Sequence, residues 1–182
     1  MRFDRRSGLR LPLVDTDLER RRARLRELGI GTRPDEEFDR FAAALAQAAG
    51  APYAMVNFIT GQQYFAGLYS TSDPQYHRVS ERTMALDHGW CPDVLHRTMP
   101  LTLPDVMASA HFASNPVVDK LGIRTYVGAP LLDPESGTTL GTVCFISPEP
   151  RDRSEGDALY ALITAHRDAL MNSILRRPRL SP

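Results

Sequence analysis

Short runs of apolar, aromatic and β-branched residues recur through the middle of the chain and predict strands. We expect five of them, at residues 53–59, 62–68, 101–103, 124–132 and 138–146. Thr60-Gly61 separates the first two runs as a tight hairpin would, and a turn at 133–137 that contains Asp, Pro and Gly joins the last two. The middle of the chain is therefore predicted to form a mostly antiparallel sheet.

Apolar residues recur at helical spacing towards both ends of the chain. We predict helices over residues 15–28, from about 34 to 49 and from about 157 to 174. Thr32 is expected to cap the second helix, Gly50 to end it, and Ser154 to open the third. Because helices bracket the sheet on either side along the chain, the predicted fold class is α+β.

The first predicted helix carries a narrow apolar stripe of Leu18, Leu25 and Leu28, which is too thin to bury the helix in a core unaided. Arginines crowd the same region, since residues 1–26 hold nine arginines against four acidic residues. We interpret the run from Arg20 to Arg26 as the solvated face of this helix, and the leucine stripe as a contact for a partner helix.

Length and composition fit one globular domain. The chain has 182 residues, of which 42% are apolar and 24% charged, so a separate catalytic or DNA-binding module has little room. We place the domain at residues 15–175, between a flexible basic arm at 1–14 and a tail at 176–182. No aromatic residue interleaves with the clustered arginines, so nucleic acid is not a predicted partner. With no apolar run long enough for a signal sequence or a membrane span, a cytoplasmic protein without membrane contact is expected.

Several motifs, in this order, resemble the GAF domain family. They are Gly89-Trp90-Cys91, Leu103-Pro104-Asp105-Val106, Asn115-Pro116-Val117-Val118, residues 121–131, and Leu140-Gly141-Thr142-Val143-Cys144. The resemblance covers about residues 34–175. It implies a profilin-like fold with a central antiparallel sheet of five or six strands. The N- and C-terminal helices would pack together on one face, and a loop with short helices would roof a pocket on the other.

The resemblance also implies a class of function. GAF domains commonly dimerise through their terminal helices and host cyclic nucleotides, tetrapyrroles or small metabolites, so the fold alone does not identify a ligand. We expect a stand-alone sensory domain that forms a homodimer, with a separate kinase or regulator as a further candidate partner. Among 22 lysines and arginines only Lys120 is lysine, which indicates a G+C-rich bacterial genome of actinobacterial type.

The residues expected to face the pocket combine aromatic rings, polar groups and two thiols. They are Phe65, His88, Trp90, Cys91, Asp105, Phe112, Asn115, Tyr126, Thr142 and Cys144. Aromatic walls with a few polar groups suit a small planar ligand. The same rings could instead fill the cavity themselves, and both interpretations stay open. A cyclic nucleotide is less well supported, because no glycine-rich phosphate loop is present and Arg97 or Arg124 would have to neutralise the phosphate.

Cys91 is the strongest candidate for a chemically reactive residue. We expect it to cap a short helix that begins at Pro92, where the helix dipole lowers the pKa of a thiol, although Asp87 and Asp93 nearby would favour the protonated form. Cys144 is expected inside a strand, on the same side as Thr142 and Ile146. It is either a buried residue that only packs in the core or a redox partner of Cys91.

The free methionine-R-sulfoxide reductases, relatives within the GAF family, carry a cysteine in an element similar to Gly89-Trp90-Cys91 and further cysteines downstream. Here the downstream region reads His111-Phe112-Ala113-Ser114-Asn115. A serine hydroxyl cannot replace the thiolate that attacks a sulfoxide, so this departure argues against reductase activity.

The five histidines predict neither a metal site nor haem. No pair of histidines or cysteines has the spacing of metal ligands. If haem were bound, His88 or His111 would be the axial candidate.

Three functions follow from these observations. The first is a non-catalytic sensory domain in signal transduction, which binds a small ligand or a protein partner as a dimer and for which no cofactor is assigned. The second is a thiol-based redox sensor, or an enzyme similar to the sulfoxide reductases, that uses Cys91 with Cys144. The third is a dimeric adaptor with a filled pocket. The sequence favours the first.

Overall fold

The computed structural model describes residues 2–3, 10–11 and 15–177 of the chain. Within these residues six strands form one antiparallel sheet in the order β5-β4-β3-β8-β7-β6. The strands are β3 (Tyr53–Ile59), β4 (Gln63–Ser70), β5 (Thr83–Met84), β6 (Leu101–Leu103), β7 (Thr125–Leu132) and β8 (Thr139–Ser147). The five predicted strands and both hairpins are confirmed. The sequence pattern missed β5, because a strand of two residues is too short to show alternation.

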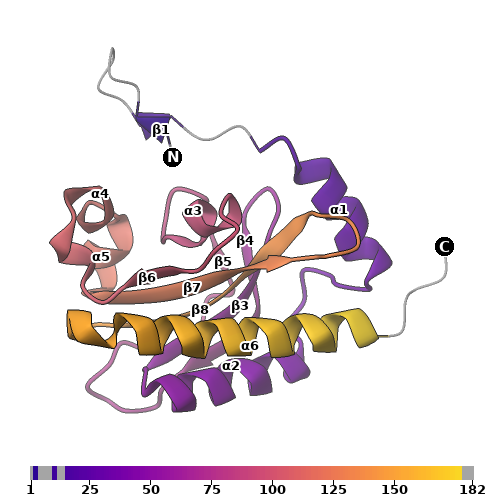
Figure 1. The fold of residues 1–182 in the computed structure, drawn as a ribbon. Coiled ribbons are helices and arrows are strands. Elements are labelled where there is room, and N and C mark those ends of the chain that lie inside the picture. The colour runs from indigo at the N-terminus through magenta and orange to yellow at the C-terminus, as the bar shows by residue number, and fades with distance from the viewer. Residues whose placement is uncertain (1, 4–9, 12–14, 178–182) are drawn as a thin grey trace.

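Helices cover both faces of this sheet (Figure 1). On one face α2 (Glu36–Ala49) and α6 (Gly156–Arg176) lie side by side. On the other face lie the short helices α3 (Cys91–Leu95), α4 (Ala110–Ala113) and α5 (Pro116–Leu121), with a 3-10 turn at Val106–Ala108. Helix α1 (Leu18–Glu27) lies beside the turn that joins β7 to β8. The predicted α+β arrangement is confirmed.

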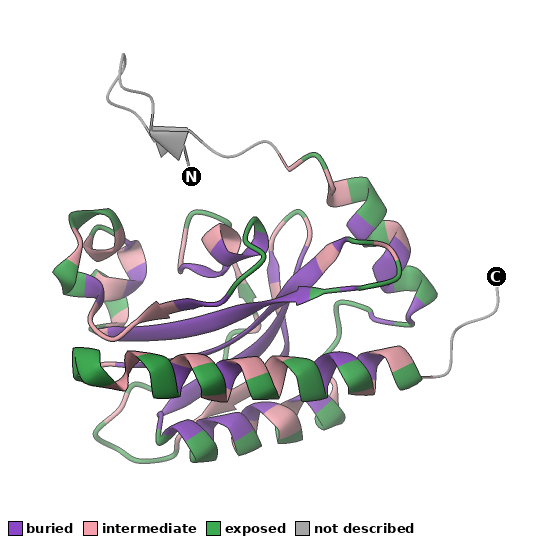
Figure 2. Cartoon of the chain, in the orientation of Figure 1, coloured by how far each residue is buried: buried purple, intermediate pink, exposed green. Residues whose placement is uncertain are grey.

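Alternation along the strands creates two hydrophobic cores, one on each side of the sheet. In β8, Val143 and Phe145 point towards α2 and α6, whereas Cys144 and Ile146 point towards the short helices. Successive side chains of a strand face opposite sides of a sheet, and here both sides are covered. The central strands are therefore buried along almost their whole length (Figure 2).

Two of the predicted helix starts are wrong by a few residues. The side chain of Asp35, not Thr32, caps α2, because its carboxylate accepts hydrogen bonds from the backbone N–H groups of Glu37 and Phe38. At the other end of the chain Asp152, not Ser154, opens the helical segment. It forms a reciprocal capping box with Glu155 over a 3-10 turn that leads into α6. Gly50 ends α2 in the left-handed conformation, as predicted.

The leucine stripe of α1 is used inside the chain, which corrects its interpretation as a contact for a partner. Leu25 and Leu28 are buried in the core beneath α2 and α6. Two arginines of the supposed solvated face, Arg21 and Arg24, are buried as well. A helix with few apolar residues can still dock tightly when its buried charged groups are paired. Here Arg24 Nε lies 2.7 Å from Asp133 Oδ2.

The predicted arm at residues 1–14 lies mostly outside the described residues. Within it β1 (Arg2–Phe3) pairs antiparallel with β2 (Arg10–Leu11). Of the predicted tail, Arg176 ends α6, Arg177 is described, and residues 178–182 lie outside the described residues. Among the helices of the described segments, none combines the length and the apolar character needed to cross a bilayer.

Candidate functional site

The chain between β4 and β7 covers the face of the sheet that lies opposite α2 and α6. We call residues 71–124, apart from the short strands β5 and β6, the roof. Its three short helices pack on Met55, Tyr126 and Cys144 of the sheet, within one hydrophobic cluster. The predicted pocket would lie between the roof and these strand residues.

Aromatic side chains fill most of that space. Trp90 from the roof and Tyr126 from β7 are both almost fully buried, and their ring centroids are 5.2 Å apart. The cavity that remains beside them has a volume of about 30 Å³. A cavity of this size holds about one water molecule. Of the two interpretations of the aromatic set, the filled interior is the one that the structure supports.

Two thiols meet beside this small cavity. Cys91 begins α3 and Cys144 lies in β8, and their Sγ atoms are 3.6 Å apart. Cys91 is therefore the first residue of its helix and not the cap, a position that Trp90 takes. The buried hydroxyl of Tyr126 lies 3.5 Å from Cys91 Sγ and donates a hydrogen bond to it.

The surroundings of the two thiols differ in their effect on ionisation. A hydrogen bond from Cys144 lowers the pKa of Cys91 against the opposing effect of burial, and Thr142, Tyr126 and Asn57 act in the same direction. The neighbouring Cys91 sulfur and burial raise the pKa of Cys144. Burial is also the main cause that raises the pKa of Tyr126. Cys91 is thus the thiol of the pair that ionises first.

Asn115 fixes the roof above the thiols. Its Oδ1 accepts hydrogen bonds from the N–H groups of Gly89 and Val117, and its Nδ2 donates to the Gly89 carbonyl oxygen. The side chain therefore caps α5 and at the same time holds the turn that precedes α3. Gly89 has a φ of +70°, a conformation that suits glycine.

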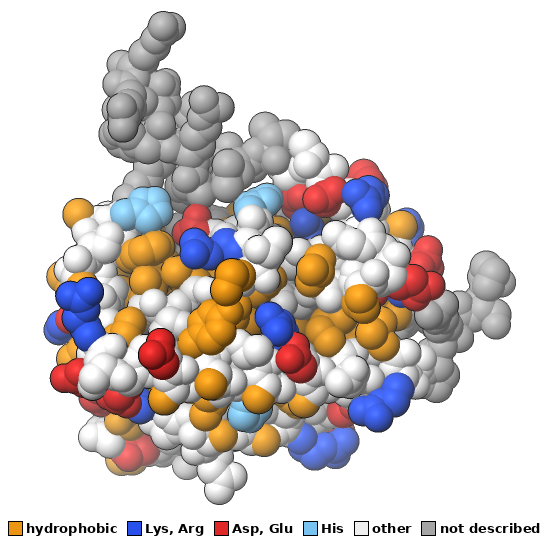
Figure 3. Space-filling model, viewed as in Figure 1, with side chains coloured by type: hydrophobic (Ala, Val, Ile, Leu, Met, Phe, Trp, Pro, Cys, Tyr) orange, Lys and Arg blue, Asp and Glu red, His pale blue; other side chains and the backbone are white. Residues whose placement is uncertain are grey.

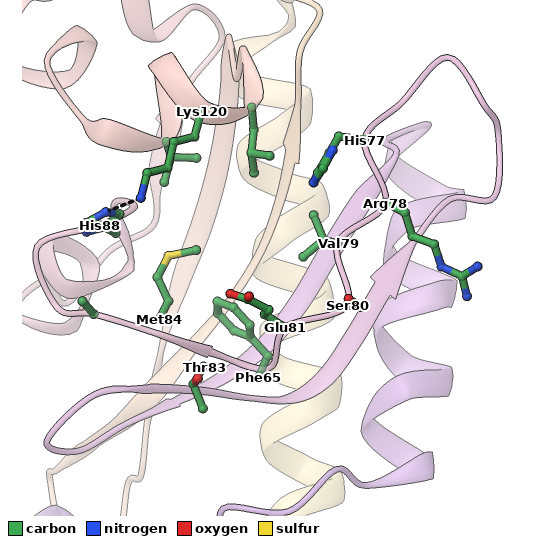
Figure 4. A pocket seen from close by; sticks show the side chains of 13 residues that line it. Phe65, His77, Arg78, Val79, Ser80, Glu81, Thr83, Met84, His88 and Lys120 are labelled. Atoms are coloured by element: carbon green, nitrogen blue, oxygen red, sulfur yellow. Dashed lines mark hydrogen bonds between the residues drawn. The ribbon is translucent and has the colours of Figure 1, made fainter.

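A larger hollow lies between the loop before β5, strands β4 and β5, and helix α5, and we call it the roof groove. Its volume is about 390 Å³, and Figure 4 shows side chains from the loop before β5 facing side chains from α5 across it. The residues that line it are Phe65, His77, Arg78, Val79, Ser80, Glu81, Thr83, Met84, Ala85, His88, Val117, Lys120 and Leu121. Phe65, Val79 and Met84 point into the groove, whereas the side chain of Arg78 points away from it (Figure 4).

One end of the roof groove carries a line of polar side chains. Lys120 Nζ lies 3.0 Å from His88 Nε2, and His88 Nδ1 lies 2.7 Å from Asp87 Oδ1. The hydrogen bond with His88 lowers the pKa of Asp87, so this carboxylate stays ionised at neutral pH. Its hydrogen bond favours a proton on His88 Nδ1, which leaves Nε2 free to accept from the lysine ammonium group.

The predicted site residues divide between several places. Phe65 and His88 line the roof groove, and Trp90, Cys91, Tyr126 and Cys144 surround the small cavity together with Phe65. Thr142 is buried in β8 next to the thiols, and Phe112 packs against the hydrophobic cluster between the roof and the sheet. Asp105 lies apart from both hollows, where it pairs with Arg124 and caps the 3-10 turn.

Sequence reasoning missed the residues that make most of the roof groove. Val79, Glu81 and Met84 come from an irregular loop and a very short strand, which show no periodicity. Lys120 left one signal, since it is the only lysine of the sequence. In the described residues we find no group of three or more histidine, cysteine or acidic side chains that could hold a metal ion.

Comparison with known proteins supports the resemblance seen in the sequence. The family model for the GAF domain matches residues 33–166. No curated protein matches the chain significantly.

Solved structures share the fold at low sequence identity. The GAF domain of an Acinetobacter phosphoenolpyruvate-protein phosphotransferase is 14% identical with a TM-score of 0.57, over 90% of this chain and 95% of that one. A GAF domain of A. aeolicus has a TM-score of 0.55 and 14% identity, over 88% and 97% of the two chains. A type II free methionine-R-sulfoxide reductase of Thermoplasma acidophilum has a TM-score of 0.53 and 12% identity, over 76% and 92%. At sequence identities this low, these similarities establish a shared fold and no more.

Proposed function

The chain belongs to the GAF domain family, and on that premise we propose that it is a sensory or regulatory domain that binds a small molecule in the roof groove. The volume of this groove, about 390 Å³, carries the proposal. A ligand needs a concave site of a few hundred Å³. The interior cavity beside the two thiols keeps only about 30 Å³, so the ligand would bind in the roof groove, which shares Phe65, Met84 and Val117 with that cavity.

The lining of the groove indicates the chemistry of the ligand. Phe65, Val79 and Met84 offer an apolar floor, and the Lys120 ammonium group, held by His88, offers hydrogen-bond donors and positive charge at one end. An apolar body with a single anionic group matches both features, because a charge-assisted hydrogen bond to the ammonium group fixes its orientation. We therefore assign the ligand to this chemical class.

A ligand in the groove would connect two parts of the fold. Phe65 belongs to β4, whereas Lys120 belongs to α5, whose cap Asn115 also holds Gly89 before α3. Binding would hold these elements in one arrangement and shift the population towards it. The signal would pass to a protein partner, either a second copy of the chain through α2 and α6 or a separate kinase or regulator.

The alternatives are less well supported. A sulfoxide reductase needs an accessible thiolate, but both cysteines of the sequence are buried, and Ser114 stands in the downstream region. A dimeric adaptor without a ligand agrees with the filled interior but leaves the roof groove without a role. Nucleic acid stays outside the proposal, because acidic and basic side chains of the described residues are interspersed on the face in Figure 3.

A fluorescence titration with 8-anilinonaphthalene-1-sulfonate tests the proposal, because this probe has an aromatic body and one sulfonate. We expect one site per chain. Lys120→Ala should weaken binding about fivefold to tenfold, the equivalent of about 1–1.4 kcal/mol. Val79→Trp should abolish binding by filling the floor.

Arg78→Ala is the matched control, because it removes one positive charge from a residue that lines the groove but points away from it. The probe should bind this variant as it binds the unmodified protein. Equal binding to all three variants, or no binding to any form, would overturn the assignment of the groove and favour the adaptor.

A further inference from the structure

The two cysteines of the chain lie on different elements and face each other. Cys91 Sγ in α3 and Cys144 Sγ in β8 are 3.6 Å apart, and the two residues are separated by 53 positions in the sequence. A disulfide bond requires a sulfur separation of about 2.05 Å. The two atoms therefore need to approach by roughly 1.5 Å, which a small movement of the side chains or of the short helix α3 provides.

The small cavity gives this pair a selective access route. Both cysteines line it, together with Met55, Met84 and Tyr126, and its volume is about 30 Å³. Only molecules close to the size of water fit such a space. The roof covers both thiols, since Cys91 is 5% exposed and Cys144 2% exposed. Hydrogen peroxide is small enough to enter, whereas a bulky disulfide such as oxidised glutathione is not.

The polar contacts of the pair assign different tasks to the two thiols. Tyr126 and Cys144 both lie within hydrogen-bond distance of Cys91 Sγ and can donate to a thiolate there. A thiolate is the nucleophile towards peroxides, and these donors lower the pKa of Cys91. Cys144, whose nearest polar neighbours are Cys91 and the sulfur of Met55, keeps its proton longer.

We propose that Cys91 and Cys144 form a reversible peroxide-sensitive thiol pair, a second input besides the roof groove. The Cys91 thiolate attacks one peroxide oxygen, the O–O bond breaks, hydroxide leaves and Cys91 becomes a sulfenic acid. The Cys144 sulfur then attacks the Cys91 sulfur, which releases the sulfenic oxygen as water. In total two thiols lose two electrons and two protons, and one peroxide becomes two waters. A dithiol reductant reverses the change by exchange once local opening of the roof exposes the bond.

The bond would tie the roof to the centre of the sheet. α3 then cannot move away from β8, and the turn before α3 carries His88, which lines the roof groove. Gln63 of β4 already holds that turn through the carbonyl oxygens of Ala85 and His88. Oxidation would therefore make this side of the roof more rigid.

Intact mass spectrometry with peptide mapping tests the thiol pair in the full chain. After treatment with one equivalent of hydrogen peroxide, the unmodified protein should lose two hydrogen masses and show a linked peptide of Cys91 and Cys144. Dithiothreitol, which is too large for the small cavity, should restore the starting mass slowly in the folded protein and rapidly in denaturant. Oxidised glutathione should give no product unless the protein is unfolded.

Variants and an internal competitor complete the experiment. Cys144→Ser should trap a sulfenic acid on Cys91, detected as a dimedone adduct, whereas Cys91→Ser should leave Cys144 reduced at the same dose. Met99 and Met107 are the exposed competitors, at 57% and 51% exposure. If these methionines oxidise while both thiols stay reduced, or if the two cysteine variants react alike, the proposal fails. The result on the unmodified protein decides even where a variant does not fold.

Discussion

Asn115 holds Gly89 with both ends of its side-chain amide, accepting from the Gly89 N–H at 2.9 Å and donating to the Gly89 carbonyl oxygen at 2.8 Å. These two bonds join the start of α5 to the turn before α3, which are 26 positions apart in the sequence. Lys120 of α5 adds a contact with His88 of the same turn at 3.0 Å. The integrity of the roof is expected to depend strongly on the Asn115 amide, which makes three hydrogen bonds.

Replacement of Asn115 by alanine should loosen the roof. The change leaves two Gly89 backbone groups and the Val117 N–H without their partner, so we expect a loss of about 1–3 kcal/mol in the free energy of unfolding. Cys91 should also become more reactive towards a thiol reagent under native conditions. Urea denaturation and thiol labelling measure the two effects. Asn172→Ala on the exposed side of α6 is the control and should change stability by less than about 0.5 kcal/mol. Equal labelling rates in the two variants would contradict the role of Asn115.

The buried ion pair between Arg24 and Asp133 should contribute strongly to the docking of α1. Arg24 Nε lies 2.7 Å from Asp133 Oδ2, and the Asp133 side chain is completely buried. Arg24→Ala leaves that carboxylate without its cation, and we expect a cost of about 3–5 kcal/mol in the free energy of unfolding. Arg22→Ala breaks an exposed pair with Glu19 on the same helix and should cost at most about 1 kcal/mol. Similar losses in both variants, measured by urea denaturation, would show that burial of the pair does not matter.

Gly141 allows β8 to approach β3 closely. A Cβ atom at this position would overlap the Asn57 carbonyl oxygen and come within 2.8 Å of Phe58 Cα, and neither backbone atom can move easily. Gly141→Ala should therefore lower the melting temperature, with a loss of about 1–3 kcal/mol in stability. Gly156→Ala at the start of α6 meets no atom within 4 Å and has helical dihedral angles, so it should be neutral or slightly stabilising. A stable Gly141→Ala protein would contradict the close strand packing.

Arg177 gives the fold a component of acid sensitivity. It pairs with Asp35 at 2.8 Å and with Glu37 at 2.7 Å, and so joins the end of α6 to the start of α2. For Asp35, the hydrogen bond from Arg177 is the main cause that lowers the pKa. For Glu37, the hydrogen bond from Ser173 is the main cause that lowers the pKa, and the hydrogen bond from Arg177 lowers it further.

Groups whose pKa is lower in the folded state stabilise the fold fully above their unfolded pKa, near 4, and lose this effect as the pH falls through the folded value. Arg177→Gln should therefore cost about 0.5–1 kcal/mol at pH 7 and less at pH 3. Urea denaturation at both pH values measures the difference. Arg176→Gln, which removes an exposed arginine that bonds to its own helix, is the control. A cost for Arg177→Gln that is equal at both pH values would refute the link to the two carboxylates.

Much of the fold could be predicted because the sheet and its two long covering helices leave strong periodic signals. The alternation in β8 even placed Cys144 on the side of the roof, where it meets Cys91. The burial of α1 against the rest of the fold could not be predicted from the sequence of the helix itself. Arg24 is neutralised by Asp133, which lies 109 positions further along the chain, and a local pattern cannot show such a partner.

The candidate site was harder to predict than the fold. The aromatic residues were placed on the right face, but their packing left a space for about one water, and rings alone do not reveal whether they line a cavity or fill it. The roof groove depends on how an irregular loop folds back against α5, which follows from tertiary packing. Of its lining residues, Phe65 and His88 were expected to face a pocket, and Lys120 was noted as the single lysine.

Because Lys120 is the only lysine of the sequence, it allows the most direct test of the roof groove as the ligand site. Reductive methylation followed by intact mass spectrometry reports on this one side chain and the N-terminal amine. With saturating 8-anilinonaphthalene-1-sulfonate, methylation of Lys120 should slow at least about tenfold in the unmodified protein, as expected for a buried charge contact, while the N-terminal amine reacts as before. The Val79→Trp variant should show no protection. Methylation of Lys120 at an unchanged rate in the presence of bound probe would contradict the assignment of the groove.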